Sequence, residues 1–386
     1  MDILAAGLIA LIVWVVLLVA RGQFWRIETL FEAPPLPDRE TWPSVVAIVP
    51  ARNEAEALAE TLPALLRQNY PGQFSLLVVD DQSSDGTGEV ARGMTAEARA
   101  PSVVRGASPP PGWTGKLWAM QQGLARADDS GPPPDYVLFV DADIVLSSDV
   151  LRRVVVMAED RGAVLVSLMA KLRCKSAAER WLTPAFIFFF RMLYPFAWVN
   201  DARRRIAAAA GGCMLVRRQT LREAGDLAAL KGALIDDCAL AALMKQRGPI
   251  WLGLTEEALS LRAYSRFGEF AAMVMRSAFA ELRYSEFRLA FVIVAMALVF
   301  VAPPLLALFS GGLPQAFGIA SWAMMAIAFA PMLRFYRQPL VFALALPVIA
   351  STYALFTIGS AVQYWSGRGG QWKGRIQAPT PRERRA

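Results

Sequence analysis

The chain has 386 residues, a formal net charge of +7, no histidine and three cysteines. Hydrophobic residues make up 55% of it and charged residues 19%, against about 45–50% and about 25% in soluble domains, so the composition favours a membrane protein. Without histidine there can be no Ser-His-Asp triad and no imidazole-ligated zinc site. Acid–base chemistry must use carboxylates, Lys, Tyr or Cys. The cysteines form no CxxC pair, which argues against a disulfide framework and a cysteine zinc site.

The chain starts with an apolar stretch that carries no charge between Asp2 and Arg21. Its length falls within the range of about 17–25 residues that span a bilayer. A secretory signal peptide would begin with basic residues and end at a small-residue cleavage site, whereas the basic residues here, Arg21 and Arg26, follow the apolar run. We therefore expect an uncleaved anchor over residues 1–22 with its N-terminus outside, followed by a linker over 23–43 in the cytoplasm.

Residues 44–284 have ordinary polarity and are expected to form one α/β domain. Helical patterns alternate with short, continuous apolar runs, which are typical of strands buried on both faces of a parallel sheet, at 44–49, 75–80, 136–140 and 164–168. The alternation predicts an open α/β sheet, and such sheets bind ligands outside the carboxyl ends of their strands. The first helix is expected over 54–68, with Asn53 as its N-cap and Glu56 as the capping-box partner.

Polar residues directly follow three of these strands, in the segments Pro50-Ala51-Arg52-Asn53-Glu54, Asp80-Asp81 with Ser84-Asp85-Gly86-Thr87, and Asp141-Ala142-Asp143. Two aspartates separated by one residue just past a strand can face one hard cation. Carboxylate oxygens suit Mg²⁺ or Mn²⁺, and phosphates usually complete the shell. Each aspartate taken singly is also compatible with a helix cap or an Asx turn, as for Asp85. The three groups together predict a ligand site at one edge of the sheet.

A second acidic pair, Asp236 and Asp237, opens a helical pattern over residues 236–247 that is expected to stop at Gly248. Both carboxylates then lie in the first turn, where the helix dipole favours their ionised form. Either one could therefore act as a general base at neutral pH. Simple N-capping is the alternative, and it suits Asp236 better than Asp237.

In this order the motifs resemble those of the nucleotide-sugar domain of family 2 glycosyltransferases, which has the GT-A fold with a Rossmann-like half for the nucleotide. The segments Gly211-Gly212 and Asp236-Asp237-Cys238-Ala239-Leu240 extend the resemblance, which covers about residues 44–284. The resemblance implies an α/β fold of the GT-A class combined with the N-terminal anchor and about three C-terminal transmembrane helices.

The resemblance also implies an inverting sugar transfer assisted by a divalent cation, Mg²⁺ or Mn²⁺. Asp141 and Asp143 would be its ligands, and Asp237 would be the catalytic base, with Asp236 beside it. The metal would neutralise charge on the leaving diphosphate without a proton transfer. A base opposite the leaving group implies direct displacement with inversion at C1, so no carboxylate nucleophile is needed.

Contacts to the nucleotide-sugar donor are implied for Pro50, Arg52, Glu54, Asp81, Lys116, Asp141 and Arg276. Lys116 would supply positive charge to the diphosphate and Asp81 would face the uracil or ribose, although a solvated loop lysine and a surface Arg52 are open alternatives. Many relatives carry an Arg-Trp signature after the acidic pair, and this chain lacks it. Arg276 is the first candidate to replace that arginine, and Arg283 is the second.

A finer resemblance rests on Gly112–Trp118, Met273–Ser285 and Trp372-Lys373-Gly374-Arg375. These segments resemble membrane-anchored members that act on lipids, most closely the hopene-associated glycosyltransferases of bacterial hopanoid gene clusters. This implies transfer from a nucleotide sugar, with a UDP-sugar favoured, to a lipid at the cytoplasmic face of the inner membrane. The excess positive charge is concentrated in the tail beside a membrane segment, which argues against a nucleic-acid partner. The alternatives are a polyprenyl-phosphate sugar synthase, a polysaccharide synthase, or an inert membrane scaffold that kept the fold.

The C-terminal region over 285–363 contains three apolar runs, each long enough to span a membrane, at 289–309, 316–333 and 340–362. Prolines inside them predict kinks or a re-entrant segment. The tail over 364–386 has six basic residues and one acidic residue. Three full crossings would leave this tail outside, whereas the positive-inside rule requires it, with Arg334 and Arg337, in the cytoplasm. We therefore expect one C-terminal segment not to cross fully. The aromatic segment 181–198 is interpreted as an interfacial element or, alternatively, as a buried helix.

Overall fold

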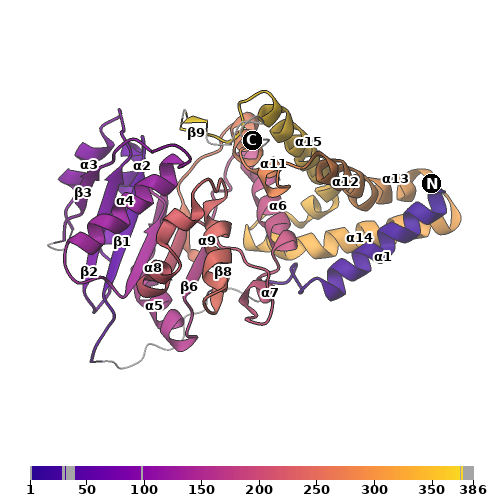
Figure 1. The fold of residues 1–386 in the computed structure, drawn as a ribbon. Coiled ribbons are helices and arrows are strands. Elements are labelled where there is room, and N and C mark those ends of the chain that lie inside the picture. The colour runs from indigo at the N-terminus through magenta and orange to yellow at the C-terminus, as the bar shows by residue number, and fades with distance from the viewer. Residues whose placement is uncertain (1, 28–30, 32–39, 97–98, 374, 377–386) are drawn as a thin grey trace.

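The computed structural model describes residues 2–27, 31, 40–96, 99–373 and 375–376. A domain built on a β-sheet lies at one end and an arm of apolar helices at the other (Figure 1). The strands are β1 (Val45–Ala51), β2 (Phe74–Asp80), β3 (Ser102–Arg105), β4 (Tyr136–Val140), β5 (Ile144–Leu146), β6 (Leu165–Lys171), β7 (Cys213–Arg217), β8 (Ile250–Ser260), β9 (Gln371–Trp372) and β10 (Arg375–Ile376).

The helices of the sheet domain and its edge are α2 (Ala55–Leu66), α3 (Thr87–Gly93), α4 (Gly115–Asp129), α5 (Val150–Asp160), α6 (Ala177–Leu193), α7 (Phe196–Asn200), α8 (Arg218–Glu223), η1 (Asp226–Leu230), α9 (Asp236–Lys245), α10 (Phe267–Met275) and α11 (Ala278–Glu281). The remaining helices are α1 (Ile3–Ala20), α12 (Glu286–Met296), η2 (Ala297–Val301), α13 (Ala302–Phe309), α14 (Gly312–Phe335), η3 (Leu340–Ala345) and α15 (Leu346–Trp365).

The main sheet has the strand order β3-β2-β1-β4-β7-β6-β8-β5. Strands β3, β2, β1 and β4 are parallel, and β6 is parallel to β8. Strand β7 is antiparallel to both of its neighbours and β5 is antiparallel to β8. The predicted α/β class and the four predicted strands are confirmed, and the sheet contains both parallel and antiparallel pairs. A continuous apolar run indicates that a strand is covered on both faces, but it does not indicate whether the strand is parallel or antiparallel to its neighbours.

Alternate residues of β1 enter two hydrophobic clusters on opposite faces of the sheet, as the period of two in a strand requires. Ile48 joins the cluster that contains residues of α4, and Ala47 and Val49 join the cluster that contains residues of α2. Helix α4 approaches β1 so closely that a Cβ on Gly123 would lie 2.5 Å from Cγ2 of Ile48. This close packing fixes the start of α4 at the carboxyl edge of the sheet.

The predicted N-cap of α2 is wrong. Asn53 has φ = 50° and lies outside the helix, and its side-chain oxygen accepts a hydrogen bond from the backbone N–H of Ser84. The cap residue is Glu54, whose side chain makes no capping bond, so the expected box with Glu56 does not form. The Asn53 side chain thus binds the loop after β2 instead of capping α2.

The aromatic segment forms α6 and α7 between the sheet domain and the apolar arm. Phe188 of α6 packs against Phe24 and Phe329, at ring-centre distances of 5.3 Å each. Phe189 packs against Phe300 and Tyr353. These rings lie among the arm helices, so α6 links the sheet domain to the arm, and its interfacial position stays a prediction.

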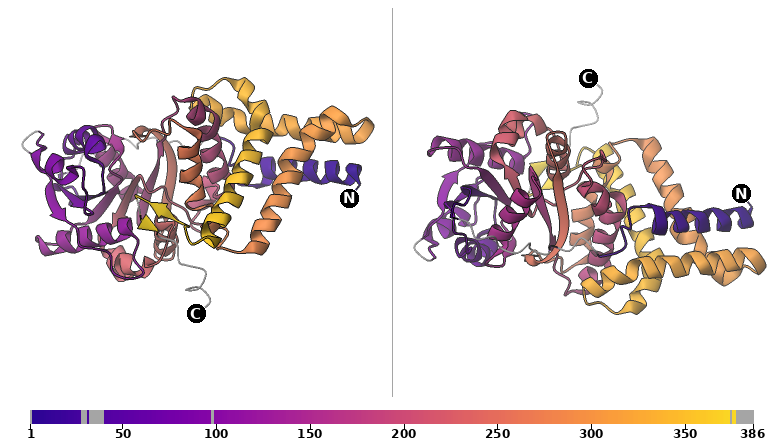
Figure 2. Two further views of the ribbon diagram at one scale, coloured as in Figure 1. Left: turned by 90° about the horizontal axis from the view of Figure 1, so that it is seen from above. Right: turned by 90° about the horizontal axis from the view of Figure 1, so that it is seen from below.

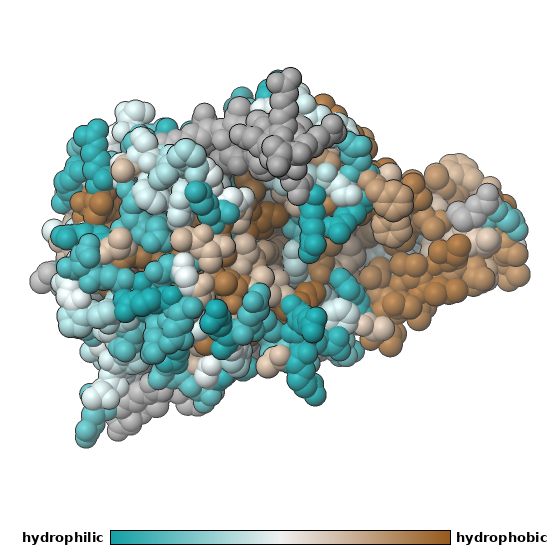
Figure 3. All heavy atoms as spheres, viewed as in Figure 1, coloured by the Kyte–Doolittle hydropathy of each residue, from teal (hydrophilic) through white to brown (hydrophobic). Residues whose placement is uncertain are grey.

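Four segments are long and apolar enough to cross a membrane: Ile3–Ala20, Glu286–Phe309, Gly312–Phe335 and Leu340–Trp365. Large apolar side chains are exposed along them, and Figure 3 shows a hydrophobic arm beside a mostly hydrophilic domain. Helices α1 and α14 run side by side along the arm (Figure 2).

The last apolar segment begins and ends beside the sheet domain. Just before it, a guanidinium nitrogen of Arg337 lies 3.9 Å from a carboxylate oxygen of Glu256 in β8. At its other end the Trp365 ring packs on Phe279 of α11, and Lys373 then reaches the backbone carbonyl of Asn53. Both ends of the segment, and the described start of the tail, therefore lie on one side of the arm.

Candidate functional site

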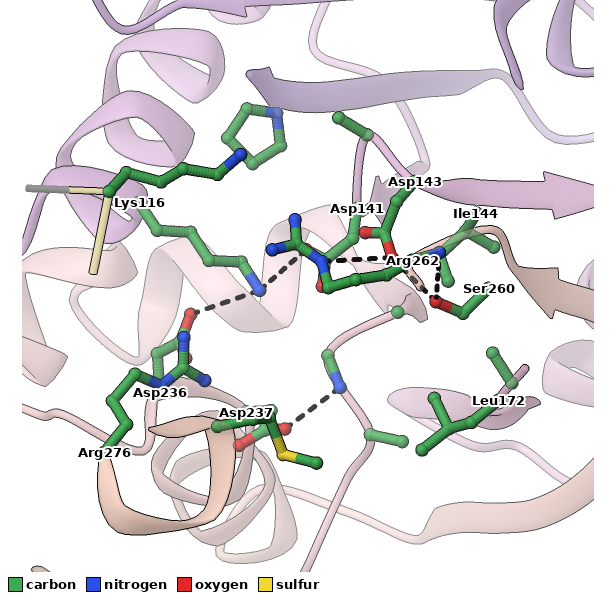
Figure 4. A pocket seen from close by; sticks show the side chains of 18 of the residues that line it. Lys116, Asp141, Asp143, Ile144, Leu172, Asp236, Asp237, Ser260, Arg262 and Arg276 are labelled. Atoms are coloured by element: carbon green, nitrogen blue, oxygen red, sulfur yellow. Dashed lines mark hydrogen bonds and ion pairs between the residues drawn. The ribbon is translucent and has the colours of Figure 1, made fainter. Parts of the chain in front are cut away.

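A pocket of about 440 Å³ opens where the carboxyl ends of β1 and β4 meet α9, α10 and the end of β8. Its floor is polar and part of its wall is apolar (Figure 4). Of the residues predicted for the site, those that line it are Pro50, Arg52, Glu54, Lys116, Asp141, Asp143, Asp236, Asp237 and Arg276. The second choice for the missing arginine signature, Arg283, does not line it.

Lys116 lies in the first turn of α4 and links two of the acidic segments. Its ammonium nitrogen is 2.7 Å from Oδ1 of Asp141 and 3.8 Å from Oδ2 of Asp236. Burial by itself would lower the pKa of Lys116, but the carboxylates around it raise that pKa above its usual value. Burial and the charge of Asp143 raise the pKa of Asp141, and Lys116 opposes this. Lys116 is thus a fixed positive charge inside the pocket, and the solvated-lysine alternative is not what the structure shows.

Asp143 is held from the end of β8. The hydroxyl of Ser260 donates to its Oδ2 at 2.7 Å, and Nε of Arg262 lies 3.6 Å from the same oxygen. Arg262 also donates to Oε1 of Glu54 at 2.6 Å, and the ammonium of Lys373 lies 2.9 Å from that oxygen. The two carboxylates of the Asp-x-Asp segment are therefore each accompanied by a cation.

Asp81 is the one predicted site residue that does not line the pocket. It is 1% exposed, and its backbone carbonyl accepts a hydrogen bond of 2.6 Å from Nη1 of Arg52. Arg52, which does line the pocket, is thus the neighbour through which Asp81 is linked to it. Asp85 accepts hydrogen bonds from the backbone N–H groups of Ala55 and Thr87, at 3.1 and 3.0 Å, which is the turn and cap role that the sequence left open for it.

Asp237 is fixed by two backbone donors. Gly211 N–H donates to Oδ2 at 3.0 Å and Cys238 N–H to Oδ1 at 2.7 Å. Burial, followed by the neighbouring charge of Asp236, raises the pKa of Asp237 to about 6, against the opposing effects of Lys116 and the two N–H groups. The helix dipole alone predicted a fully ionised group, so burial outweighs the dipole here. At neutral pH the carboxylate form still predominates.

Gly211 lies close to two charged groups of the pocket. A Cβ at this position would lie 3.1 Å from Nζ of Lys116 and 3.4 Å from Oδ2 of Asp237. The ammonium of Lys116 would have to move by a few tenths of an ångström, whereas the contact with Asp237 would be an ordinary van der Waals one. The glycine therefore allows the lysine to lie close to this loop.

The chemistry of the donor set fits a divalent cation only in part. Among the described residues, no group of three or more His, Cys, Asp or Glu side chains could hold a metal ion. Asp141 and Asp143 nevertheless place two carboxylates on the pocket lining, and oxygen donors are what Mg²⁺ and Mn²⁺ prefer. Mg²⁺ is commonly held by one or two carboxylates plus substrate phosphates and water, so these two residues fit an ion that arrives with a phosphate ligand.

Part of the pocket wall is apolar, and the helices that carry it, α6 and α10, pack on α15 of the arm. Phe186 and Phe190 of α6 contribute to it, with Ala272 and Met273 of α10. Arg276, at the end of α10, adds a cation beside this wall. The pocket therefore combines a charged floor with an apolar side next to the apolar helices of the arm.

The chain was compared with known proteins. Residues 43–251, more than half of the chain, match the family model described as "Glycosyltransferase like family 2". An N-acetylglucosaminyltransferase of Mesorhizobium japonicum is 29% identical over 196 residues, which are 48% of this chain and 42% of that protein. A 4,4'-diaponeurosporenoate glycosyltransferase of Staphylococcus haemolyticus is 32% identical over 110 residues, 28% of this chain and 27% of that protein. The matched regions thus span less than half the length of these relatives.

Among solved structures, a mannosyltransferase from Pyrobaculum calidifontis, in complex with GDP-Man and Mn²⁺, has a TM-score of 0.56 at 20% sequence identity. The likeness covers 94% of this chain and 98% of that one. It supports the predicted GT-A fold. Because the family model covers more than half of the sequence, the chain belongs to the glycosyltransferase-like family 2.

Proposed function

We propose that this protein is a membrane-bound, inverting glycosyltransferase that moves a sugar from a nucleotide-sugar donor to a lipid hydroxyl. One observation carries the proposal: a single pocket holds the Asp141–Asp143 pair, several fixed cations and Asp237, and its apolar side faces the arm. An inert scaffold would have no need for this arrangement.

The cationic side chains suit the donor diphosphate. Lys116, Arg262 and Arg276 project into the same cavity (Figure 4), and fixed positive charges in a partly buried site stabilise the charge that develops on a leaving phosphate. A Mg²⁺ or Mn²⁺ ion bound with the donor through Asp141 and Asp143 would add Lewis-acid stabilisation of the same charge. The names of several relatives favour UDP-N-acetylglucosamine as the first UDP-sugar to test.

Asp237 is the group that accepts the proton from the acceptor hydroxyl. As the oxygen of that hydroxyl forms its bond to C1, the bond between C1 and the diphosphate oxygen breaks, and the proton goes to the carboxylate. Displacement from the face opposite the leaving group inverts C1 in one step. Asp236 stays beside Asp237 and modulates its pKa.

A lipid is the acceptor that the apolar wall suits best. Phe186, Phe190 and Met273 form one side of the cavity, and the helices that carry them pack on α15. A molecule whose body lies in the bilayer could therefore bring its hydroxyl to Asp237 without leaving apolar surroundings. The motifs shared with hopene-associated enzymes favour a hopanoid or a related polycyclic lipid.

The orientation follows from the positions of the helix ends. We infer that α1 crosses inward, that α12–α13 leads out and α14 returns, and that the segment 340–365 lies along the membrane boundary without crossing. This places Arg334, Arg337 and the basic tail on the same side as the sheet domain, as the positive-inside rule requires. The catalytic domain would then face the cytoplasm of a cell with an inner membrane.

Full-length protein in detergent or nanodiscs, supplied with UDP-N-acetylglucosamine, Mn²⁺ and a lipid extract, tests the proposal. UDP release and a new lipid with a hexosamine mass increment are expected. Asp143→Ala should abolish both, whereas Asp160→Ala, an exposed position on α5, should leave both unchanged. Full activity of Asp143→Ala would exclude the proposed metal site. Donor hydrolysis without any lipid product, across extracts that include hopanoids, would exclude the lipid acceptor and favour a polysaccharide or other soluble acceptor.

A further inference from the structure

Arginines gather around two tryptophans where the first apolar helix meets the sheet domain. We call this group the arginine platform, and it consists of Arg21, Trp25, Arg26, Trp198, Arg203, Arg204 and Arg205. The guanidinium of Arg21 lies 5.0 Å from the centre of the Trp198 ring and that of Arg204 lies 4.6 Å from it. One indole is thus shared by an arginine at the end of α1 and an arginine in the loop after α7.

The platform is attached rigidly to the arm. Gly22 has φ = 60°, and a Cβ there would lie 2.8 Å from Nε1 of Trp198, so the turn after α1 rests directly on α7. Arg21 also donates through Nε to the carbonyl of Met192 and through Nη2 to that of Leu193, at 3.1 and 3.0 Å. These contacts fix the position of α7 and the loop after it relative to the end of α1.

The excess positive charge of the platform points outward. Segment 195–206 contains three arginines and one acidic residue, Asp201, and Arg21 adds a fourth arginine beside Trp198. Asp201 contacts Arg203 at 3.0 Å and Arg204 at 3.7 Å, yet their side chains are 90% and 50% exposed. Asp201 offsets only one of these four charges, so the surface around Trp198 remains cationic.

The position of the platform identifies what it binds. Helix α7 lies beside the domain end of α1 (Figure 1), and the exposed apolar side chains of the arm begin at α1. Tryptophan and arginine are the residues that favour the headgroup zone at such a boundary, and basic side chains there are attracted to anionic lipids. No platform residue lines the pocket. We propose that the platform binds the phosphodiester headgroups of anionic phospholipids in the leaflet that faces the sheet domain.

Native mass spectrometry of the full-length protein, in neutral detergent with phosphatidylglycerol or phosphatidylcholine, measures this directly. More phosphatidylglycerol than phosphatidylcholine should bind, and added salt should reduce the difference. At about fivefold per basic residue, the triple variant Arg203→Gln, Arg204→Gln, Arg205→Gln should lose up to ~100-fold in affinity for phosphatidylglycerol. Replacing the same three residues by Lys should retain the preference, because the charge is kept.

The matched control removes three exposed arginines from the far part of the sheet domain, with Arg67→Gln, Arg92→Gln and Arg126→Gln. It should keep the wild-type preference. Equal losses in both triple variants, or no loss in the platform variant, would overturn the proposal. So would displacement of the lipid by UDP, which would place it in the pocket, or by glycerol 3-phosphate, which would indicate a site for soluble phosphate.

Discussion

The pH dependence of the reaction follows from the surroundings of Asp237. Burial and the charge of Asp236 raise its pKa from 3.8 to about 6. A base works in its ionised form, so activity should be lost as the pH falls through about 6. At pH 5 about one-tenth of a group with that pKa is ionised, so kcat/KM should be about tenfold below its plateau. An aspartate with an ordinary pKa would still be mostly ionised at that pH.

Two substitutions separate the causes of this shift. Asp236→Asn removes a negative neighbour, so the pKa of Asp237 should fall and the acid limb should move to lower pH. We expect a shift of about half a unit to one unit, because burial is the larger cause. Asp237→Asn should lower kcat by about 10²–10⁴, the usual contribution of a general base, and should remove the limb.

The assay is initial-rate UDP release by the full-length protein at limiting donor, because kcat/KM reports the ionisation of the free enzyme. Asp160→Asn is the control and should reproduce the wild-type profile. An acid limb near pH 4 in the wild type, or a limb that stays in place in Asp236→Asn, would refute the assignment of the raised pKa to this pair. Appreciable activity of Asp237→Asn would show that another group takes the proton.

Three further outcomes are expected. Lys116→Met should weaken UDP binding by at least tenfold and strengthen Mn²⁺ binding in the absence of UDP, both measured by calorimetry. Arg218 is 2% exposed and pairs with two carboxylates, so Arg218→Met should lower the free energy of unfolding by about 3 kcal/mol in denaturant titrations. The control is Arg92→Met, which removes an exposed ion pair and should cost under about 1 kcal/mol. Trp14→Phe should destabilise the arm by about 1–2 kcal/mol in thermal unfolding, because it leaves the carbonyl of Val299 without the indole N–H that lies 2.9 Å away.

The last of these expectations rests on the π-helical turn η2. Pro303 has no backbone N–H, so it cannot donate to the carbonyl four residues earlier, which belongs to Val299. The indole of Trp14, on a different helix, supplies the missing donor. The prolines in this run did predict an irregularity from the sequence. The helix that compensates for it could not be predicted, because it is 285 residues away along the chain.

The strand ends of the pocket were predictable because each signal was local. An apolar run followed directly by aspartates indicates both a buried strand and its polar end, and Asp141 and Asp143 do line the pocket. Asp236 and Asp237 were likewise predictable from an acidic pair that opens a helical pattern. For Asp81 the local signal was the same, but this residue is buried and does not line the pocket. Burial of a loop residue depends on the segments that pack around it, so the sequence of the loop alone could not predict it.

Arg262 and Lys373 were the residues that sequence reasoning missed. Strand β8 has charged residues in its second half, so it does not stand out as an apolar run. Because the strand was not predicted, Arg262 could not be recognised as a residue that follows the end of a strand. Lys373 lay in a segment noticed for its resemblance but was given no role. Its contact with the carbonyl of Asn53 spans 320 residues and depends on the whole path of the chain through the arm and back.

The charges of the pocket explain why donor and metal should bind together. The pocket lining has six carboxylates, from Glu54, Asp141, Asp143, Asp236, Asp237 and Glu269, and five cations, from Arg52, Lys116, Arg262, Arg276 and Lys373. These charges nearly balance without any ligand. A divalent cation alone would enter beside the ammonium that already contacts Asp141, and a diphosphate alone would enter beside six carboxylates. Each by itself would upset the balance in a partly buried site, where unpaired charge is costly. A diphosphate that arrives with its cation adds almost no net charge, and the pocket's own lysine and arginines can then turn to the phosphate oxygens.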